Sequence, residues 1–494
     1  MRRTELKKQK ARKRRYLVRR ISAAALVLAV IAALFLGITR VVGAWPWEEQ
    51  SGADAAVETT TTSSPFSTST SSTTLALPST TSTTSRGPIG PPVTLAVETQ
   101  PTEASLAITQ ADGETLEGTT PFEGDVPGGL TTIVLSHVGY NTVTHDVGVK
   151  ESISLRFYLD PEGLLHESYG RFTVGSQPKQ VAFTPDGSEI WVTLLGGKGL
   201  EIYDARSLTE IGSVQLGSHG SVEVIFNQAG TTAYISQMET GSVYEVDVAS
   251  RKVQRQLNAG GNWTKIMALS PDEKTLYTAN WTSHNVGVID LASGSVVRTF
   301  STVKTPRGLY VTPDGSRLYV AGFENGDISR IDLATGDSTI ITKTGGAMRH
   351  LVGDGSYLYA DDMALAKVYK VDLATDEVTE LAKVDAKPNT IDLSPDGRVL
   401  YVSCRGENGE NYYLPGPEWG SVVMIDTATG RMLDAIVGGN QCTGLDISPD
   451  GTMLAFSDFL DDRVRLYLCP PTQVLIDGEG GRAGAHRADI PKKG

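Results

Sequence analysis

A short stretch, SPDGRVLYVS at residues 394–403, is the clearest copy of a unit that recurs along this chain. Close copies read TPDGSEIWVT at residues 184–193, SPDEKTLYTA at 270–279, TPDGSRLYVA at 312–321 and SPDGTMLAFS at 448–457. Two weaker copies, at residues 227–236 and 353–360, keep the turn and an aromatic residue but lose the proline. The chain therefore carries seven copies of one unit, and the copies that begin at Ser270 and Thr312 lie 42 residues apart.

Each unit predicts four short antiparallel strands. An apolar run such as residues 308–311 predicts the first strand, and Pro-Asp-Gly supplies one fixed φ and one position of positive φ, which make a hairpin turn. The aromatic run is the return strand. A third strand, as at residues 286–291, ends in a second turn at 292–294, and residues 295–300 close the unit. Because no helical period interrupts this repeat, the sequence predicts an all-β fold built on a seven-bladed β-propeller.

Length, charge and cysteine content narrow the class of protein. A chain of 494 residues is too long for one ordinary domain. The net charge is −13, although residues 1–40 hold twelve Lys or Arg and one Glu, so the remainder carries −24. Such an acidic body excludes nucleic-acid binding by general electrostatics. Three cysteines in the last quarter of the chain exclude a dense disulfide framework.

The N-terminus predicts a membrane anchor. Residues 1–20 form a basic tail, and residues 21–39 form an apolar run of 19 residues, which spans about 28 Å as a helix and is long enough to cross a bilayer. A cleavable signal peptide is the competing interpretation. By the positive-inside rule the tail is cytoplasmic and the rest of the chain is extracellular, so we expect a single-pass protein of the cell membrane.

Two segments precede the repeat. Residues 40–92 are dominated by Thr and Ser, with Pro and Gly near the end, and predict a disordered stalk. Residues 93–161 show apolar alternation broken by turn clusters, and predict a small β-domain.

This small domain resembles a known module. PTEA at residues 101–104, GTTPF at 118–122, VPGG at 126–129 and GY at 139–140 resemble the PEGA domain, a small β-sandwich of bacterial surface proteins. The resemblance implies a spacer in the cell envelope without catalytic residues of its own.

The repeat itself also resembles a known family. LYVS at residues 400–403, LYVA at 318–321, the Pro-Asp-Gly turns and IDLATG at 331–336 resemble the YVTN family of surface-layer-type propellers, also called YncE-like. The resemblance implies the propeller fold but no single function, because such propellers serve as scaffolds, binders and enzymes. We expect the propeller over residues 166–470 and a disordered tail over 471–494. Residues 168–174 are expected to supply the missing fourth strand of the last blade and so close the ring.

Candidate ligand-binding residues gather on one face of the predicted propeller. The loop into the first strand of a blade and the loop between its second and third strands share a face, which we call the mouth. These loops carry Trp263, Asn280, Trp281, Arg307, Arg349, His350, Asp361, Asn389, Arg405 and Asp458. Convergent polar groups at a concave site are typical of ligand binding. The sequence therefore predicts a binding protein whose ligand in the cell envelope is a glycan or a protein.

Two features of the mouth leave alternatives open. Trp263 and Trp281 belong to a repeated Asn-Trp-Thr tripeptide, and their indoles either stack on a flat ligand such as a sugar or pack against the neighbouring blade. Residues 406–420, with Tyr412, Tyr413 and Trp419, lengthen one blade and form either a lip over the mouth or a solvated insertion.

A search for catalytic motifs finds no Gly-x-Ser-x-Gly, His-Glu-x-x-His or Cys-x-x-Cys. No catalytic residue, metal ligand or cofactor is therefore assigned. His350, with Asp361 and Asp362 nearby, is the one cluster suited to acid–base work or to a metal such as Ca²⁺. The alternative function is thus a propeller enzyme of lactonase or lyase type that acts at the mouth.

The cysteines allow one candidate disulfide. Cys404 and Cys442 fall on the mouth face of adjacent predicted blades, whereas Cys469 falls on the opposite face. Outside the membrane an oxidised pair is favoured, so Cys404–Cys442 is the candidate bridge. The alternative is three unpaired cysteines, because a bridge needs Cα atoms within about 7 Å.

Overall fold

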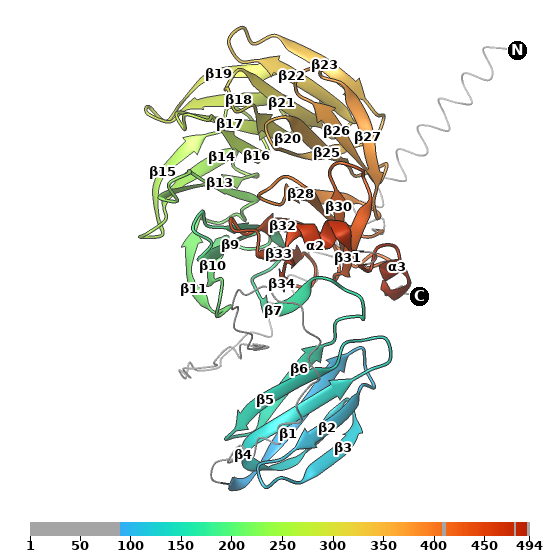
Figure 1. Cartoon of the computed structure of the whole chain (residues 1–494). Helices are drawn as coiled ribbons and strands as arrows, with labels where there is room; N and C mark the ends of the chain where they lie inside the picture. Colours follow the sequence, from blue (N-terminus) through green and yellow to red (C-terminus); the bar gives the residue numbers. More distant parts are fainter. Residues whose placement is uncertain (1–88, 408–411, 479–480, 492–494) are drawn as a thin grey trace, which may run out of the picture. The chain divides into compact units, whose positions relative to one another are not determined.

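The computed structural model describes residues 89–407, 412–478 and 481–491 (Figure 1). The predicted cytoplasmic tail, the predicted transmembrane helix at residues 21–39 and nearly all of the predicted stalk lie outside these residues. Within the described ranges, no helix has the length and apolar character needed to cross a membrane.

Seven four-stranded antiparallel sheets form the larger part of the structure, and each is one blade of the predicted propeller. Blades 1 and 2 consist of β8 (Pro178–Phe183), β9 (Glu189–Leu194), β10 (Gly199–Asp204), β11 (Glu210–Gln215), β12 (Glu223–Phe226), β13 (Thr232–Gln237), β14 (Ser242–Asp247) and β15 (Lys252–Asn258). Blades 3 and 4 consist of β16 (Thr264–Leu269), β17 (Thr275–Asn280), β18 (Asn285–Asp290), β19 (Ser295–Ser301), β20 (Pro306–Val311), β21 (Arg317–Gly322), β22 (Asp327–Asp332) and β23 (Ser338–Lys343).

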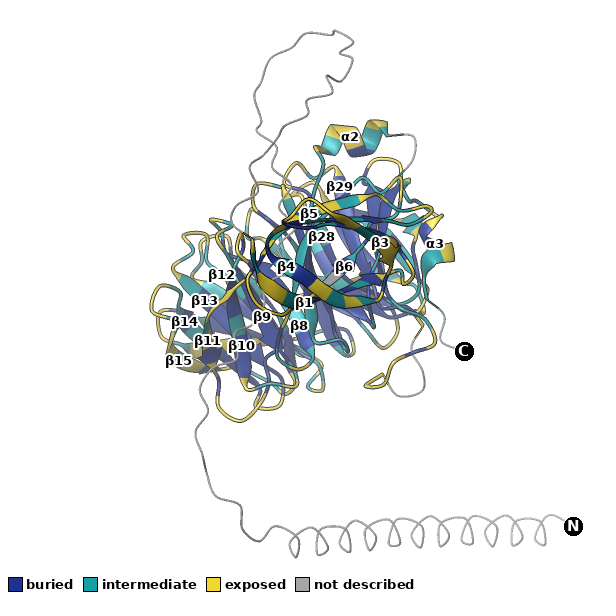
Figure 2. Cartoon of the chain, turned by 90° about the horizontal axis from the view of Figure 1, so that it is seen from below, coloured by how far each residue is buried: buried dark blue, intermediate teal, exposed yellow. Residues whose placement is uncertain are grey.

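The remaining blades keep the same order. Blades 5 and 6 consist of β24 (Met348–Gly353), β25 (Tyr357–Asp362), β26 (Lys367–Asp372), β27 (Val378–Lys383), β28 (Pro388–Leu393), β29 (Val399–Cys404), β30 (Ser421–Asp426) and β31 (Met432–Val437). The first strands of all seven blades contact one another in a closed inner ring. Hydrophobic clusters fill the space between neighbouring blades, so the second strands are almost wholly buried, while the fourth strands of blades 1 to 5 are largely exposed (Figure 2).

The last blade closes the ring as the sequence predicts. It consists of β32 (Cys442–Ile447), β33 (Met453–Asp458), β34 (Arg463–Leu468) and, from before blade 1, β7 (Glu167–Thr173). β7 pairs antiparallel with β34, with Thr173 opposite Arg463 and Glu167 opposite Leu468. The expectation that residues 168–174 complete this blade is confirmed. A ring closed in this way leaves no free inner edge for pairing with another chain.

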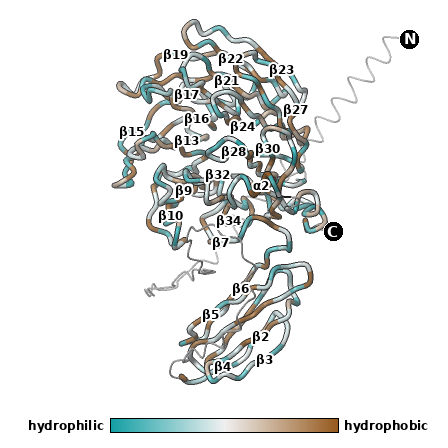
Figure 3. The backbone as a smooth tube through the Cα atoms, in the orientation of Figure 1, coloured by the Kyte–Doolittle hydropathy of each residue, from teal (hydrophilic) through white to brown (hydrophobic). Residues whose placement is uncertain are grey.

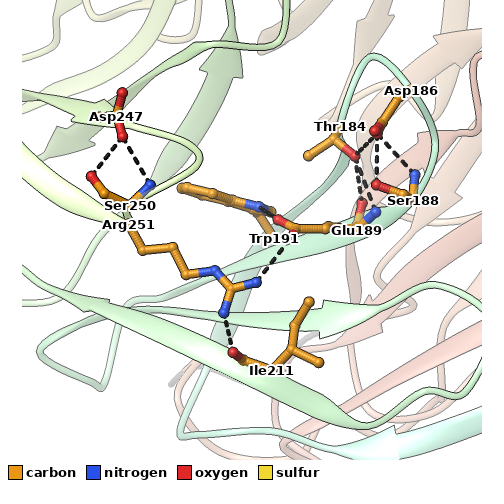
Figure 4. Close-up of polar contacts among 9 residues, drawn as sticks. All are labelled: Thr184, Asp186, Ser188, Glu189, Trp191, Ile211, Asp247, Ser250 and Arg251. Atoms are coloured by element: carbon orange, nitrogen blue, oxygen red, sulfur yellow. Dashed lines mark hydrogen bonds and ion pairs between the residues drawn. The ribbon is translucent and has the colours of Figure 1, made fainter.

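The Pro-Asp-Gly turns are built by side-chain hydrogen bonds. In blade 1, Thr184 Oγ1 donates to Asp186 Oδ1 at 2.6 Å, and the same oxygen accepts the backbone N–H of Ser188 at 3.0 Å (Figure 4). Gly187 has a φ of 72°, the positive value that the turn requires. The same hydroxyl-to-carboxylate bond recurs at Ser270–Asp272, Thr312–Asp314, Ser394–Asp396 and Ser448–Asp450. The repeated Ser/Thr-Pro-Asp motif therefore specifies the turn chemically.

The smaller part of the structure is a six-stranded β-domain. Its strands are β1 (Gly90–Gln100), β2 (Ser105–Thr109), β3 (Thr115–Thr119), β4 (Phe122–Ser136), β5 (Val143–Val149) and β6 (Ile153–Tyr158). The long β4 pairs with β1 through its first half and with β2 and β5 through its second half, so it joins two groups of strands. Alternating apolar residues of these strands fill one core, and the alternation is visible in Figure 3.

The expectation of a disordered tail over residues 471–494 is wrong for the described part of that segment. It contains two short helices, α2 (Thr472–Asp477) and α3 (His486–Asp489). Leu475 of α2 is 1% exposed and packs into the core of the last blades. Two buried carboxylates hold the segment: Asp434 accepts the backbone N–H of Arg482 at 2.7 Å, and Asp385 contacts His486 Nε2 at 2.6 Å. Leu475 and His486 are the residues that these two helices bury, which is too weak an apolar pattern to predict them from sequence.

Candidate functional site

The two sets of loops predicted to share the mouth are joined by backbone hydrogen bonds. In six blades the first residue after the second strand donates its N–H to the residue just before the first strand, over 2.9 to 3.1 Å. These pairs are Leu195–Gln177, Trp281–Trp263, Phe323–Thr305, Met363–Ala347, Arg405–Lys387 and Phe459–Gln441. The predicted placement of both loops on one face is therefore confirmed.

The first strands carry β-bulges that aim one side chain each toward the centre. The register of blade 1 skips from Pro178 to Gln180, and the same skip recurs at the start of the first strand in blades 3 to 7. A bulge leaves its extra residue unpaired and redirects that side chain. The bulged positions of blades 1, 3, 4 and 5 hold Lys179, Lys265, Arg307 and Arg349.

Bulge residues and their neighbours line a small recess. Its walls come from six blades, so it lies in the centre of the inner ring. The lining residues are Lys179, Gln180, Val222, Glu223, Ile266, Arg307, Arg349, His350, Asn389 and Thr390. Of the residues predicted from sequence, Arg307, Arg349, His350 and Asn389 are therefore brought together here.

Arg405 adds a further cation beside the recess. It follows β29 directly, it is 6% exposed, and one of its terminal nitrogens bonds to the side-chain oxygen of Gln441. Its guanidinium carbon lies 5.6 Å from the ring centroid of Phe459 and 6.0 Å from that of Tyr412. Aromatic rings thus form the wall around this charge, as is common for arginine.

The five cations repel one another, although Glu223 and Asp361 attract Arg307 and Asp361 also attracts Arg349. Among the residues that the structure describes, none of the five forms an ion pair. Burial, followed by the charges of the neighbouring arginines, holds the pKa of Lys179 and of Lys265 well below the usual range for lysine. Burial also lowers the pKa of Arg307 and of Arg405 to about 10. Nη1 of Arg307 and Nε of Arg405 are buried without a hydrogen-bond partner, which is unfavourable unless a ligand supplies one.

Two carboxyl groups face the same region. Glu223 accepts the backbone N–H of Met267 at 2.7 Å, and burial raises its pKa to about 8. Asp361 accepts the backbone N–H of His350 at 2.6 Å, and burial raises its pKa to about 7. Oδ2 of Asp361 is buried without a partner. At neutral pH these groups are partly protonated and do not neutralise the cations.

Asp361 departs from the pattern of the repeat. Four other blades place a hydroxyl at this position of the second strand, where it bonds to the bulged backbone or to the next blade, and these residues are Thr193, Ser236, Ser403 and Ser457. A hydroxyl is therefore enough to form the hydrogen bond at the bulge. The bulge does not use the second carboxylate oxygen of Asp361, Oδ2, which is buried without a partner.

His350 has a structural partner. Its Nδ1 lies 3.0 Å from the backbone carbonyl of Ile391 and so links the inner strands of blades 5 and 6. Burial lowers the pKa of His350 to about 4, so the imidazole is neutral at physiological pH. Within the described ranges no group of three or more His, Cys, Asp or Glu is placed to hold a metal ion.

Two predicted mouth residues are structural instead. Asn280 is fully buried and accepts the hydroxyl of Thr264 at 2.6 Å while donating to the carbonyl of Ala259 at 2.9 Å. Asp458 is fully buried and pairs with Arg465 at 2.6 Å. Both are the last residue of a second strand. Side chains alternate along a strand, so this position points away from the recess and braces the loops.

The two tryptophans pack on each other rather than lying parallel. Their ring centroids are 6.0 Å apart at an angle of 64°, and Trp281 also meets Phe323 edge-on at 5.8 Å. Trp263 is 43% exposed. Trp281 is thus a packing residue, as one of the two interpretations held, and Trp263 presents an accessible indole.

The described residues of the insertion at 406–420 contact two different parts of the structure. The backbone carbonyl of Tyr412 accepts Gln441 Nε2 at 2.7 Å, next to Arg405. A hydrogen bond with Tyr412, then burial and the charge of Glu239 from blade 2, raise the pKa of Tyr413 to about 12. Trp419 instead donates its backbone N–H to Pro491 at 3.4 Å, beside the C-terminal segment. Tyr412 and Tyr413 therefore border the mouth and Trp419 does not.

The candidate disulfide is not formed. Cys404, Cys442 and Cys469 are free thiols, and the first two are fully buried. A Cβ built on Gly420 would lie 2.5 Å from the carbonyl of Cys404 and 2.8 Å from Sγ of Cys442. The backbone of Gly420 therefore passes between the two cysteines.

Sequence reasoning missed Lys265 and Glu223 as mouth residues. A signal for the first was present: Lys179, Lys265, Arg307 and Arg349 each stand five residues before the first residue of the following turn. Stacking the repeats on that turn would have aligned all four cations.

Comparisons with known proteins agree with this architecture. The model of the family "Lactonase, 7-bladed beta-propeller" matches residues 170–344. Antigen Lp49 of Leptospira interrogans is 33% identical over 349 residues, which cover 67% of this chain and 76% of the relative. The chain belongs to the protein family of Antigen Lp49. Hydrazine synthase of Kuenenia stuttgartiensis has a TM-score of 0.52 at 20% identity, over 59% of this chain and 96% of that one, and shares the fold alone.

Proposed function

We propose that this protein is a binding protein of the cell envelope that captures its ligand at the mouth of the propeller. The observation that carries the proposal is a recess lined by Lys179, Arg307 and Arg349, with the buried cations Lys265 and Arg405 close by. The accessible indole of Trp263 lies 5.6 Å from the ammonium nitrogen of Lys265. Groups that destabilise the free protein persist where function needs them. The ligand is a glycan, a protein or a smaller envelope component, and the acidic body argues against nucleic acid.

The N-terminal segments support a location of the propeller in the cell envelope. Residues 21–39 anchor the chain, and the stalk and the small β-domain, which resembles a PEGA module, set the distance between the membrane and the propeller. The likeness of the repeat to YncE-like surface propellers agrees with this placement, as does a relative named as an antigen. Protease added to intact cells is expected to remove the propeller and leave a small anchored fragment with the basic tail. Full protection of the propeller would contradict the proposed topology.

A binding screen with the full-length chain tests the function. Glycans and metabolites are titrated against the wild type and against Arg349→Gln and Trp263→Ala. Both variants are expected to weaken the binding of any mouth ligand, because the first removes a recess cation and the second removes the accessible ring. Lys274→Gln, an exposed residue of a turn on the opposite face, is the matched control and is expected to bind normally. Ligands that bind all four proteins equally would place the site elsewhere.

A lactonase-type enzyme is the second candidate function. It is favoured by the partner-free Oδ2 of Asp361 in the recess region and by the family model over residues 170–344. With a pKa of about 7, the Asp361 carboxylate is suited to take a proton from water as that water adds to a lactone carbonyl. The ring C–O bond then breaks, and the proton passes to the alkoxide to give a hydroxy acid. Hydrolysis of a lactone panel by the wild type but not by Asp361→Asn would favour the enzyme over the binding protein.

A further inference from the structure

The charges around the recess also restrict the chemistry of the ligand. Lys179, Lys265, Arg307, Arg349 and Arg405 come from five different blades, and the first four belong to strands of the inner ring, whereas Arg405 directly follows the second strand of blade 6. Resting on the proposed binding function, we infer that the ligand of the mouth is a small polyanion with at least two phosphate or carboxylate groups.

Hydrogen-bond geometry supports an anion. Nη1 of Arg307 and Nε of Arg405 are buried donors with no acceptor in the described protein. A guanidinium offers two parallel N–H groups that match two oxygens of a phosphate or carboxylate. Lys179 and Lys265 are further hydrogen-bond donors, and their ammonium groups act as point charges for the same oxygens.

The amount of charge calls for more than one anionic group. Five cations face Glu223 and Asp361, which burial keeps partly protonated at neutral pH, and Glu239, which attracts Lys265. A single monoanion would leave most of the repulsion among the cations in place. Burial, and after it the repulsion of the neighbouring arginines, already depresses the pKa of Lys179 and of Lys265, and a bound polyanion would raise the pKa of both.

The size of the site and the charge of the body favour a small molecule. The recess is small, and the rings of Tyr412 and Trp263 lie 6.0 Å from Arg405 and 5.6 Å from Lys265, the two cations beside it. The chain outside residues 1–40 carries a net charge of −24, which repels an extended polyanion such as a nucleic acid. Only a compact ligand keeps its charges within the basic centre.

Calorimetric titration of the full-length chain with pyrophosphate, citrate, orthophosphate and uncharged maltose tests the inference. Pyrophosphate or citrate is expected to bind at least about tenfold more tightly than orthophosphate, and Arg307→Gln is expected to weaken that binding at least about tenfold. Arg398→Gln, an exposed arginine in the turn of blade 6 on the opposite face, is the matched control and should bind as the wild type does. Preference for pyrophosphate or for citrate tells phosphate ligands from carboxylate ligands.

Thermal unfolding supplies a second readout. Without ligand, Arg307→Gln is expected to melt at a higher temperature than the wild type, because one repelling charge is gone. Pyrophosphate or citrate should raise the melting temperature of the wild type but not that of the variant.

The outcomes separate this inference from the proposed function. Polyanions that bind the wild type and Arg307→Gln equally would overturn the inference. If no anion binds while an uncharged ligand binds and depends on Trp263, the inference fails and the binding function stands. If neither charged nor uncharged ligands bind, both fail.

Discussion

The ammonium nitrogen of Lys265 lies 3.7 Å from the ring centroid of Trp281. Lys265 comes from the first strand of blade 3 and Trp281 from the end of its second strand, so the contact joins the bulge to the mouth loop. The indole face that is covered by Lys265 is not available to a ligand. Lys265 lies farther from Trp263, 5.6 Å from its ring centroid, and Trp263 stays 43% exposed.

Trp281→Leu is expected to lower the free energy of unfolding by about 1–3 kcal/mol, because the cation–π contact and the packing against Phe323 are both lost. Urea denaturation measures the change. Trp263→Leu is the matched control: its ring is 43% exposed, so we expect a smaller loss. Equal losses for the two variants would show that the Lys265 contact has no special role.

Asp361→Ser is expected to remove a pH dependence of stability. The pKa of Asp361 is raised from 3.8 to about 7 in the folded state, so its contribution to stability is full below pH 4 and is lost as the pH rises to 7. The contribution of Asp361 to the free energy of unfolding falls by on the order of 4 kcal/mol over this pH range. Serine is the residue that blades 2, 6 and 7 place here.

Denaturation of wild type and Asp361→Ser at pH 4.5 and pH 7.5 checks this expectation. The difference in free energy between the two proteins should favour the variant more strongly at the higher pH. Parallel curves for the two proteins would mean that Asp361 does not titrate in this range.

Glu189→Ala is expected to weaken the contact between blades 1 and 2. One carboxylate oxygen accepts Trp191 Nε1 at 2.8 Å, and the other accepts Arg251 Nη2 at 2.8 Å (Figure 4). The loss of both bonds should lower the free energy of unfolding by about 1–3 kcal/mol. Glu210→Ala, an exposed carboxylate of the outer strand β11, should change it by less than about 0.5 kcal/mol. A comparable loss for both would contradict the role of Glu189.

The C-terminal segment is expected to come loose in acid. Burial alone would raise the pKa of Asp385, but hydrogen bonds from His486, Ser421 and Arg487 lower it to about 2. Its stabilising contribution is therefore present above pH 4 and is lost as the pH falls toward 2. Asp385→Asn should release the segment at neutral pH, which limited proteolysis detects as early cleavage after residue 478. A variant that resists proteolysis as the wild type does would show that α2 and Asp434 hold the segment without Asp385.

Much of the propeller could be predicted because its signals are local and repeated. The turn motif at Thr184–Asp186 forms its hydrogen bonds within a few residues, so the sequence alone specifies it. Closure by β7 followed from counting strands at both ends of the repeat.

The site was predicted only in part because side-chain direction depends on the bulges. Arg307 and Arg349 were found, since charged residues in mouth loops stand out in sequence. Asn280 and Asp458 were predicted on the mouth, and the structure gives both side chains protein partners, which depend on the register of the strands and could not be read from the sequence. The helices of the C-terminal segment depend on partners such as Asp385 and Asp434, which lie far away in sequence.

The pairing of β7 with β34 also sets an order of events during synthesis. Thr173 and Arg463 face each other although about 290 residues separate them, and a ribosome that adds about 5–20 residues per second needs tens of seconds to make that distance. Throughout this delay β7 has no partner, and the first and last blades lack a shared boundary. The nascent protein therefore carries an unpaired strand edge until its final blade emerges. A chaperone that protects this edge would bind at β7.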